Sequence, residues 1–109
     1  MVKVLSKEEC TLDYVDGAIK ANPLVILYFS AEWCGPCKAV ANTIQSCSEN
    51  YPEVDILKID AEDGALIAKE HRVKSLPTLI FIREGECISR TNGSLSENEL
   101  SQMISDMLK

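Results

Sequence analysis

Continuous apolar runs alternate along the chain with stretches in which apolar residues recur every third or fourth position. This alternation predicts five strands and four helices. Residues 24–29 and 78–82 are unbroken apolar runs rich in β-forming residues, which is typical of central strands covered on both faces. Three shorter runs are also expected to be strands: residues 2–5, 54–60 and 87–91. Residues 84–86 have the composition of a hairpin turn before the last of these strands.

The first helix is predicted from a capping pattern near the N-terminus. Ser6 is followed three residues later by Glu9, a spacing at which each side chain caps the other's backbone N–H, so a helix should start there. Asn22-Pro23 ends this helix, because the residue before a proline is biased away from helical backbone. The third helix is expected to be short and to cover residues 64–71.

Two longer helices are predicted to bury one apolar face each. The second helix should begin near Cys34, and the fourth at Ser96, which forms another capping box with Glu99. The inward stripe of the second helix comprises Cys37, Val40, Ile44, Cys47 and Tyr51. The buried face of the fourth helix comprises Leu100, Met103, Ile104, Met107 and Leu108.

The order of the predicted elements is β-α-β-α-β-α-β-β-α. Helical crossovers join parallel strands and a hairpin joins antiparallel ones, so the order predicts an α/β protein with a mixed sheet and helices on both faces. With 109 residues, the chain should form one domain, residues 1–109, with one modest core.

Composition and charge narrow the classes of function. The chain carries 11 basic and 17 acidic residues, a net charge of -6, which disfavours binding to nucleic acid. No apolar run is long enough to span a membrane, and the first residues lack the apolar region of a signal peptide. The five cysteines, an odd number, fit a reducing compartment. These observations together predict a cytoplasmic protein without a membrane partner.

Two of the cysteines lie in the run Trp33-Cys34-Gly35-Pro36-Cys37-Lys38, just after a predicted strand and at the start of a predicted helix. A helix N-terminus stabilises negative charge through its free N–H groups, and the thiolate is the reactive form of cysteine. Gly35 permits a close turn and Pro36 presets the backbone for the helix, so the second thiol can close a ring onto the first. The run therefore predicts thiol–disulfide exchange.

This run, with two further motifs, resembles the thioredoxin family over essentially the whole chain. Leu76-Pro77-Thr78 resembles the family's cis-proline turn, and Gly93 resembles the glycine beside its substrate groove. The resemblance implies the thioredoxin fold, a central mixed five-stranded sheet in the order 1-3-2-4-5 flanked by four helices. It also implies a protein-disulfide reductase in which Cys34 attacks the substrate disulfide and Cys37 resolves the mixed disulfide.

The resemblance further implies partners and a binding surface. The protein would bind no cofactor and would receive electrons from NADPH through thioredoxin reductase. Its other partners would be disulfide-containing proteins such as peroxiredoxins, and it would be mostly monomeric. The implied substrate-binding residues form a shallow, mostly apolar surface and are Trp33, Gly35, Pro36, Leu76, Pro77 and Gly93.

The sequence departs from the family pattern at one buried position. Many thioredoxins carry an aspartate six residues before the first cysteine, where it is thought to help deprotonate the second; here the residue is Tyr28. The lysine often paired with that aspartate is also missing, because its position aligns with Ile56, although Lys58 is close by in the sequence. Tyrosine has a reference pKa of about 10 and is a poor base. The departure predicts a slow resolving step, or a water in the role of base.

Several alternatives remain open at this point. Cys34 and Cys37 could be half of a zinc site, but the remaining ligand-type residues are too scattered, so no metal is expected. The same fold supports a disulfide isomerase or oxidant, and it also serves as a non-catalytic binding module. Cys10 and Cys47 are expected to pack in the core, whereas Cys87 is expected to be partly exposed. The single histidine, His71, should end the short helix, where a positive charge suits the helix dipole.

Overall fold

The computed structural model describes residues 2–109, and these form a sheet of five strands in the order β1-β3-β2-β4-β5. The strands are β1 (Val2–Val4), β2 (Leu24–Ser30), β3 (Asp55–Asp60), β4 (Thr78–Arg83) and β5 (Glu86–Asn92). The β1·β3 and β2·β3 pairs are parallel, whereas the β2·β4 and β4·β5 pairs are antiparallel. The mixed sheet and its predicted strand order are therefore confirmed.

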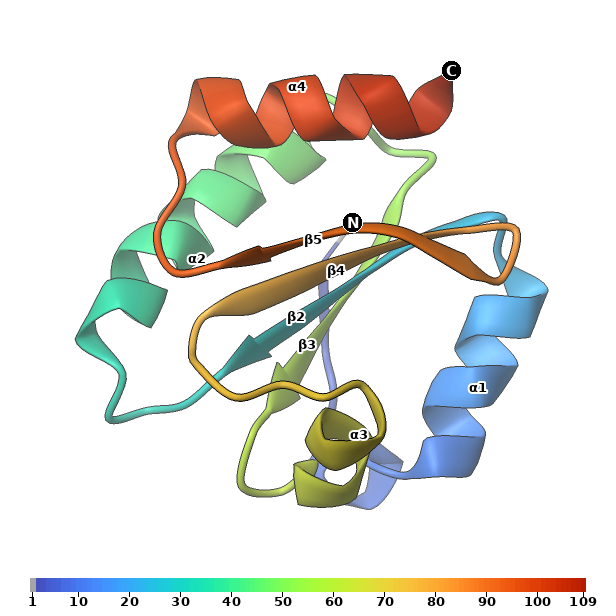
Figure 1. The fold of residues 1–109 in the computed structure, drawn as a ribbon, viewed down its shortest axis with the longest axis vertical. Helices are drawn as coiled ribbons and strands as arrows, with labels where there is room; N and C mark the ends of the chain where they lie inside the picture. The colour runs from blue at the N-terminus through green and yellow to red at the C-terminus, as the bar shows by residue number, and fades with distance from the viewer. Residues whose placement is uncertain (1) are drawn as a thin grey trace.

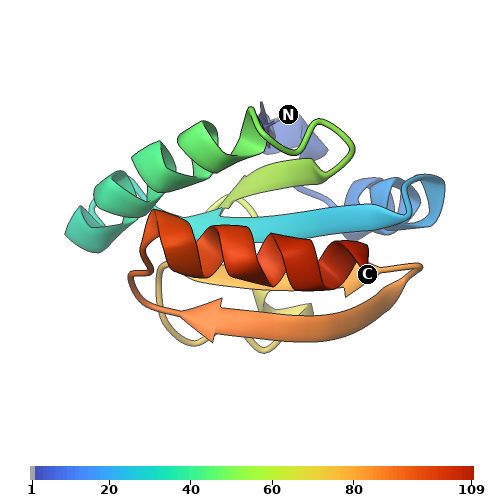
Figure 2. The ribbon, with the colours of Figure 1, turned by 90° about the horizontal axis from the view of Figure 1, so that it is seen from above.

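Helices cover both faces of this sheet. They are α1 (Leu12–Ala21), α2 (Gly35–Ser48), α3 (Ala65–Glu70) and α4 (Glu97–Leu108). Figure 1 shows α2 and α4 on one face and α1 and α3 on the other. In Figure 2 the sheet is seen from the side of α2 and α4, with α4 lying over the strands. The four helices follow the predicted order along the chain.

The start of the first helix differs from the prediction. The capping box of Ser6 and Glu9 is present, but it caps only a short 3-10 turn, η1 (Lys7–Glu9). Cys10 then leaves helical backbone, and α1 begins after Thr11, whose hydroxyl accepts a hydrogen bond from the Tyr14 N–H at 3.1 Å. Thr11 is itself a strong N-cap residue type, and this second cap sets the start of the helix.

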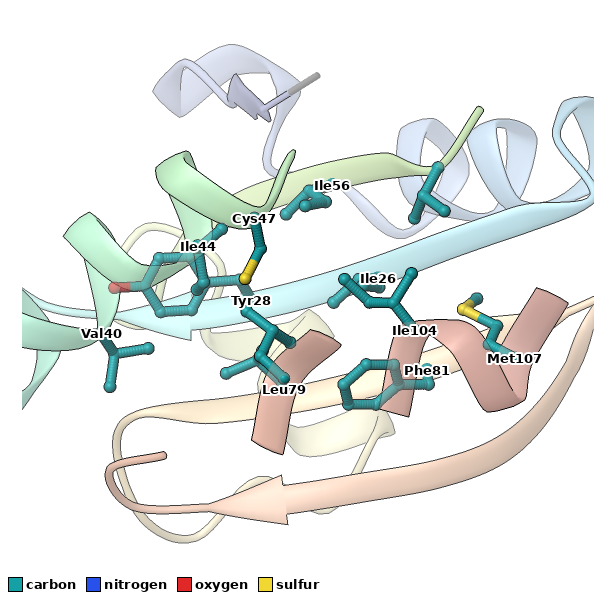
Figure 3. Packing of buried hydrophobic residues seen from close by; sticks show 12 residues of the cluster. Ile26, Tyr28, Val40, Ile44, Cys47, Ile56, Leu79, Phe81, Ile104 and Met107 are labelled. Carbon is teal, nitrogen blue, oxygen red and sulfur yellow. The ribbon is translucent and has the colours of Figure 1, made fainter. Parts of the chain in front are cut away.

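The core has two layers because successive residues of β2 point to opposite faces of the sheet. Ile26 and Tyr28 pack toward α2 and α4, and Val25, Leu27 and Phe29 pack toward α1 and α3. Figure 3 shows the first of these layers, in which the β2 side chains lie among those of the two helices.

The ends of the predicted helical stripes lie outside this core. Leu108, predicted to be buried, is 37% exposed, because it is the last residue of α4 and lies beyond the buried Met107. Met103 and Tyr51 are partly buried and pack against the edge of the α2 and α4 layer.

Three segments meet at one end of the sheet. Strand β2 ends at Ser30 and leads into α2, and its residue Phe29 pairs with Thr78, the first residue of β4. Thr78 pairs in turn with Asn92, the last residue of β5. The cysteine run, the turn before Thr78 and the turn after Asn92 are therefore brought close together.

Candidate active site

The two cysteines of the run form a disulfide at the N-terminus of α2. Cys34 is the N-cap residue of the helix, and its Cα atom lies 5.3 Å from that of Cys37. The Cys37 N–H donates a hydrogen bond to the Cys34 sulfur at 3.2 Å. The Cys34 N–H donates to the Ala31 carbonyl at 3.1 Å, which holds the turn that precedes the helix. A negative charge on the Cys34 sulfur would thus face a backbone donor and the positive end of the helix.

The disulfide lies in a shallow apolar setting just below the surface. Cys34 and Cys37 are 4% and 3% exposed and form a small cluster with Ala31, against which Leu76 packs. Gly35 and Pro36, which separate the two cysteines, are both exposed. A partner can therefore approach the disulfide from the side of these two residues and Leu76.

The turn before β4 contains a cis peptide bond between Leu76 and Pro77. The Gly93 N–H donates to the Pro77 carbonyl at 2.8 Å, which joins this turn to the one after β5. Gly93 has a φ of 84°, a backbone conformation that residues with a Cβ atom rarely adopt. The structure thus places Leu76 against the cysteine pair, and it places the buried Pro77 and the half-buried Gly93 beside each other.

Trp33 stands beside the disulfide and is 70% exposed. Its indole N–H donates to a carboxylate oxygen of Glu62 at 2.8 Å, which fixes the direction of the ring. A groove of about 800 Å³ runs from Trp33 to Leu76, with α3 and the segment after it as its other wall. Trp33 and Leu76 belong to the predicted binding surface, but the contributions of α3 and Glu62 were not predicted, because no motif indicates that α3 lies beside Trp33.

The buried Tyr28 acts as a hydrogen-bond donor to the active-site helix. Its ring is 1% exposed, and its hydroxyl donates to the Cys37 carbonyl at 3.0 Å. Figure 3 shows the hydroxyl directed at α2. Burial raises the pKa of Tyr28 above its usual value, so the phenol is protonated at neutral pH and cannot act as a base toward the Cys37 thiol.

Lys58, and not Ile56, lies beside the Tyr28 ring. Strand pairing sets Tyr28 opposite Lys58, and the Lys58 ammonium lies 5.8 Å from the centroid of the Tyr28 ring. Ile56 pairs with Ile26 two residues earlier and is buried in the core. Ile56 and Lys58 are two residues apart and therefore lie on the same face of β3.

A cleft of about 550 Å³ reaches Cys37 from the side of β1 and β3. Its lining includes Cys37, Tyr28 and Lys58 together with Ser30 and Asp60. The Asp60 carboxylate accepts hydrogen bonds from the N–H groups of Glu62 and Asp63, at 2.8 and 3.0 Å. Polar groups therefore form part of the lining on the inner side of Cys37.

The other cysteines differ in their surroundings. Cys47 is buried, and its sulfur lies 3.5 Å from the Ser101 hydroxyl. Cys10 is partly buried, and burial raises the pKa of its thiol. Cys87 is exposed, as predicted. Among residues 2–109, no three histidine, cysteine or acidic side chains are grouped as a metal ion would require.

His71 lies where α3 ends, as predicted, but its surroundings do not favour a positive charge. Its ring lies 6.3 Å from the Phe29 ring, measured between centroids. Burial lowers the pKa of His71, and the nearby acidic residues offset this only in part. Burial thus disfavours the charged form of His71 that the helix dipole would favour.

None of the helices within residues 2–109 has the length and apolar character needed to span a membrane.

A mixed sheet in this order, with a cysteine pair at the start of the helix after its second strand, defines a dithiol–disulfide oxidoreductase. The family model described as Thioredoxin matches residues 3–106, and the chain belongs to the thioredoxin family. It is a thioredoxin-type disulfide reductase whose redox pair is Cys34–Cys37.

Individual relatives agree with this assignment along nearly their whole length. The chain is 35% identical over 105 residues to thioredoxin of Chlamydia trachomatis, covering 96% of this chain and 97% of the relative. It is 33% identical over 108 residues to human thioredoxin, covering 99% and 100%. A chain from work on thiol resolution in yeast mitochondrial 1-Cys peroxiredoxin via the glutathione and thioredoxin systems superposes with a TM-score of 0.86. The two are 28% identical, with 96% of this chain and 94% of that chain covered.

Proposed function

We propose that the protein reduces disulfides of other proteins in the cytoplasm through its Cys34-Gly35-Pro36-Cys37 motif, working as one domain of residues 1–109 and mostly as a monomer. The observation that carries the proposal is the position of Cys34 at the N-cap of α2, where the Cys37 N–H donates to its sulfur. That arrangement favours the thiolate of Cys34 over the thiolate of Cys37, which lies inside the helix.

The exchange takes place in two steps. The Cys34 thiolate attacks one sulfur of the substrate disulfide; that S–S bond breaks, and the departing sulfur takes a proton. The Cys37 thiol then loses its proton and attacks the Cys34 sulfur, which breaks the mixed disulfide and releases the second substrate thiol. Two electrons have passed to the substrate, and the protein is left with its Cys34–Cys37 disulfide. The Cα separation of 5.3 Å allows this ring to close.

The substrate is held beside the pair by Trp33, Gly35, Pro36, Leu76, Pro77 and Gly93. The exposure of Trp33 and the contact of Leu76 with the cysteine cluster support this assignment. An extended substrate segment would pair with the backbone at Leu76 in the manner of an added strand. Because main-chain hydrogen bonds do not read side chains, such a surface accepts many substrates.

The proton of Cys37 leaves through solvent in the cleft beside it. Tyr28 is no alternative base, because its hydroxyl is engaged as a donor to the Cys37 carbonyl. The cleft reaches Cys37 and has polar groups in its lining, which supports a water as the carrier of this proton. We therefore expect a slow resolving step.

Recycling requires an external source of electrons. We infer that thioredoxin reductase returns the pair to the dithiol with electrons from NADPH, and that no cofactor binds to this chain. Peroxiredoxins are proposed as substrates, in line with the similarity to a chain studied with a yeast peroxiredoxin. Three cysteines outside the pair are free, which suits a reducing compartment such as the cytoplasm.

The proposal is tested by the reduction potential of the Cys34–Cys37 pair, measured by equilibration against a thiol buffer. A reductase should give about -270 mV, whereas a value near about -180 mV would indicate an isomerase. Cys34→Ser should abolish disulfide reduction, and Cys37→Ser should accumulate the mixed disulfide with substrate. A protein that keeps its activity after Cys34→Ser would contradict the mechanism.

A further inference from the structure

Two clefts of opposite charge share the exposed Trp33 in their lining. The groove between Trp33 and Leu76 contains three basic residues and no acidic one among its lining residues; the basic residues are Lys69, Arg72 and Lys74. A second cleft, of about 500 Å³, also includes Trp33 in its lining, and its other lining residues are all acidic: Glu32, Asp60, Glu62 and Asp63. The surface around the active site thus has a basic cleft and an acidic cleft that meet at Trp33.

The three groove cations are available to a partner. All three side chains are exposed. The ion pairs found within residues 2–109 are Lys3–Glu9 and Lys109–Asp106, both away from the groove. The whole chain has a net charge of -6, so three unpaired cations in one groove run against the overall charge. A local field of this kind attracts carboxylates and leaves the rest of the surface repulsive to them.

The floor of the same groove is apolar and leads to the redox pair. Ala65, Ala68 and Val73 line it, and Leu76 at its end packs against the cysteine cluster. An occupant that reaches the disulfide from this side would lay apolar groups on the floor and hold its charged groups at the basic rim. A peptide segment that precedes or follows a reactive cysteine can place its side chains in this way.

We propose that the groove beside Trp33 selects disulfide substrates that carry acidic residues on one side of the reactive cysteine. The inference rests on the proposed reduction of protein disulfides and names the substrate class of that same site. Acidic residues on the opposite side of the cysteine would face Glu62 and Asp63 and would be repelled. The groove adds no chemical step, since both electrons still come from the Cys34–Cys37 dithiol.

The test compares the reduced protein's rates with four peptides, each carrying one cysteine in a mixed disulfide with 2-mercaptoethanol. Two peptides carry a pair of aspartates, either before or after the cysteine, and two carry lysines at the same positions. Hydroxyethyl disulfide, which is neutral, reports on disulfide reduction as such. The groove variant is Lys69→Glu/Arg72→Glu/Lys74→Glu. The matched control, Lys7→Glu/Lys20→Glu/Arg83→Glu, has the same net charge but changes exposed residues that do not line the groove.

For the wild type we expect one aspartate peptide to react about tenfold faster than its lysine counterpart at low salt. The preference should approach unity near 1 M salt, where the screening length is about 3 Å. The groove variant should lose or invert this ratio, and the control should keep it. If the triple groove variant does not fold, Lys74→Glu alone should reduce the ratio in the same direction.

Three results would overturn the inference: a wild-type ratio near one, a ratio that the groove variant keeps, or an equal loss in the control variant. A gain from aspartates on both sides of the cysteine would also contradict it, because the acidic cleft would then exert no repulsion. In each of these cases continued reduction of hydroxyethyl disulfide leaves the proposed function intact. Failure of the wild type to reduce even that neutral disulfide would instead refute the proposed function itself.

Discussion

Tyr28→Phe removes a single hydroxyl from the core beside the active site, and we predict that it lowers stability while leaving the chemistry unchanged. The ring is fully buried and is retained by phenylalanine, so packing is preserved. What is lost is one hydrogen bond of 3.0 Å from the hydroxyl to the Cys37 carbonyl. A bond of this kind contributes about 1 kcal/mol to the free energy of unfolding. For a domain of this size the melting temperature should fall by roughly 5 °C.

The same substitution separates a structural tyrosine from a proton carrier. Because the hydroxyl is a donor and burial raises its pKa, it cannot take the proton of Cys37 at neutral pH. The lifetime of the mixed disulfide in Tyr28→Phe should therefore stay within about twofold of the wild type, since an engaged general base contributes about a hundredfold or more. The assay is a single-turnover reaction with a disulfide peptide, quenched in acid and read by mass spectrometry. A tenfold longer lifetime in a folded Tyr28→Phe protein would refute the reasoning.

Tyr28→Asp provides the opposite arm of this experiment. A carboxylate at this position would lie near the Lys58 ammonium and the cleft that reaches Cys37, and it could accept the proton directly or through water. The mixed disulfide should then resolve at least about tenfold faster. Loss of the buried ring should cost about 3–5 kcal/mol, so the comparison is made at low temperature with folding checked by circular dichroism. Equal lifetimes in wild type and Tyr28→Asp would contradict a rate limited by the missing base.

Three further predictions concern glycine geometry and pH. Gly93 and Gly85 have positive φ values of 84° and 81°, so Gly93→Ala and Gly85→Ala should each lower the free energy of unfolding, measured in urea, by about 1 kcal/mol. Only Gly93→Ala should also lower kcat/KM for disulfide peptides. Equal kinetic effects of the two substitutions would show that Gly93 is not part of the substrate site. Burial lowers the pKa of His71 in the folded protein from its usual value of 6.5. At pH values below 6.5 the unfolded chain therefore binds more protons than the folded protein does. Stability should fall as the pH drops below that value, and a His71→Phe protein with the same slope would disprove this. Hydrogen bonds from the Ser6 backbone and Lys3 lower the pKa of Glu9 to about 2 from 4.5, so its contribution to stability is present above pH 4.5 and is lost on acidification toward pH 2. Glu9→Gln should weaken the pH dependence of the free energy of unfolding across that interval. An unchanged pH dependence would show that the capping carboxylate does not contribute.

The strands and the mixed sheet could be predicted because the relevant signals are local and strong, whereas the strand order was implied by the resemblance to the thioredoxin family. Continuous apolar runs at β2 and β4 are long enough to identify central strands, and the alternation of helices and strands leaves few topologies. Helix boundaries are harder to predict than strands, because neighbouring N-cap residues compete to start the helix. Both Ser6 and Thr11 are good N-cap residues, and the structure uses both, one for the 3-10 turn and the other for α1.

In the candidate site, too, some features are determined by residues close together in the sequence and others by residues far apart. The cysteine pair and the turn before β4 are contained in short motifs, so their residues could be named from the sequence. The groove could not, because it is made where α3 and the segment after it pass beside Trp33. The hydrogen bond between Trp33 and Glu62 joins residues 29 positions apart, and neither residue carries a signal that points to the other.

The contact between Lys58 and the Tyr28 ring shows how much of such a contact a sequence can predict. Ile56 and Lys58 are two residues apart, so both point to the same face of β3, the face that Tyr28 occupies on β2. The period of two therefore predicts the face correctly for either residue. A displacement of two residues along a strand is nevertheless about 6–7 Å, enough to exchange a buried isoleucine for an ammonium group beside the active-site tyrosine. That displacement is decided by the register of β2 on β3, which sets Tyr28 against Lys58 through backbone pairing alone. The charge beside the redox pair is thus determined by strand register, a property that no residue near Cys37 encodes by itself.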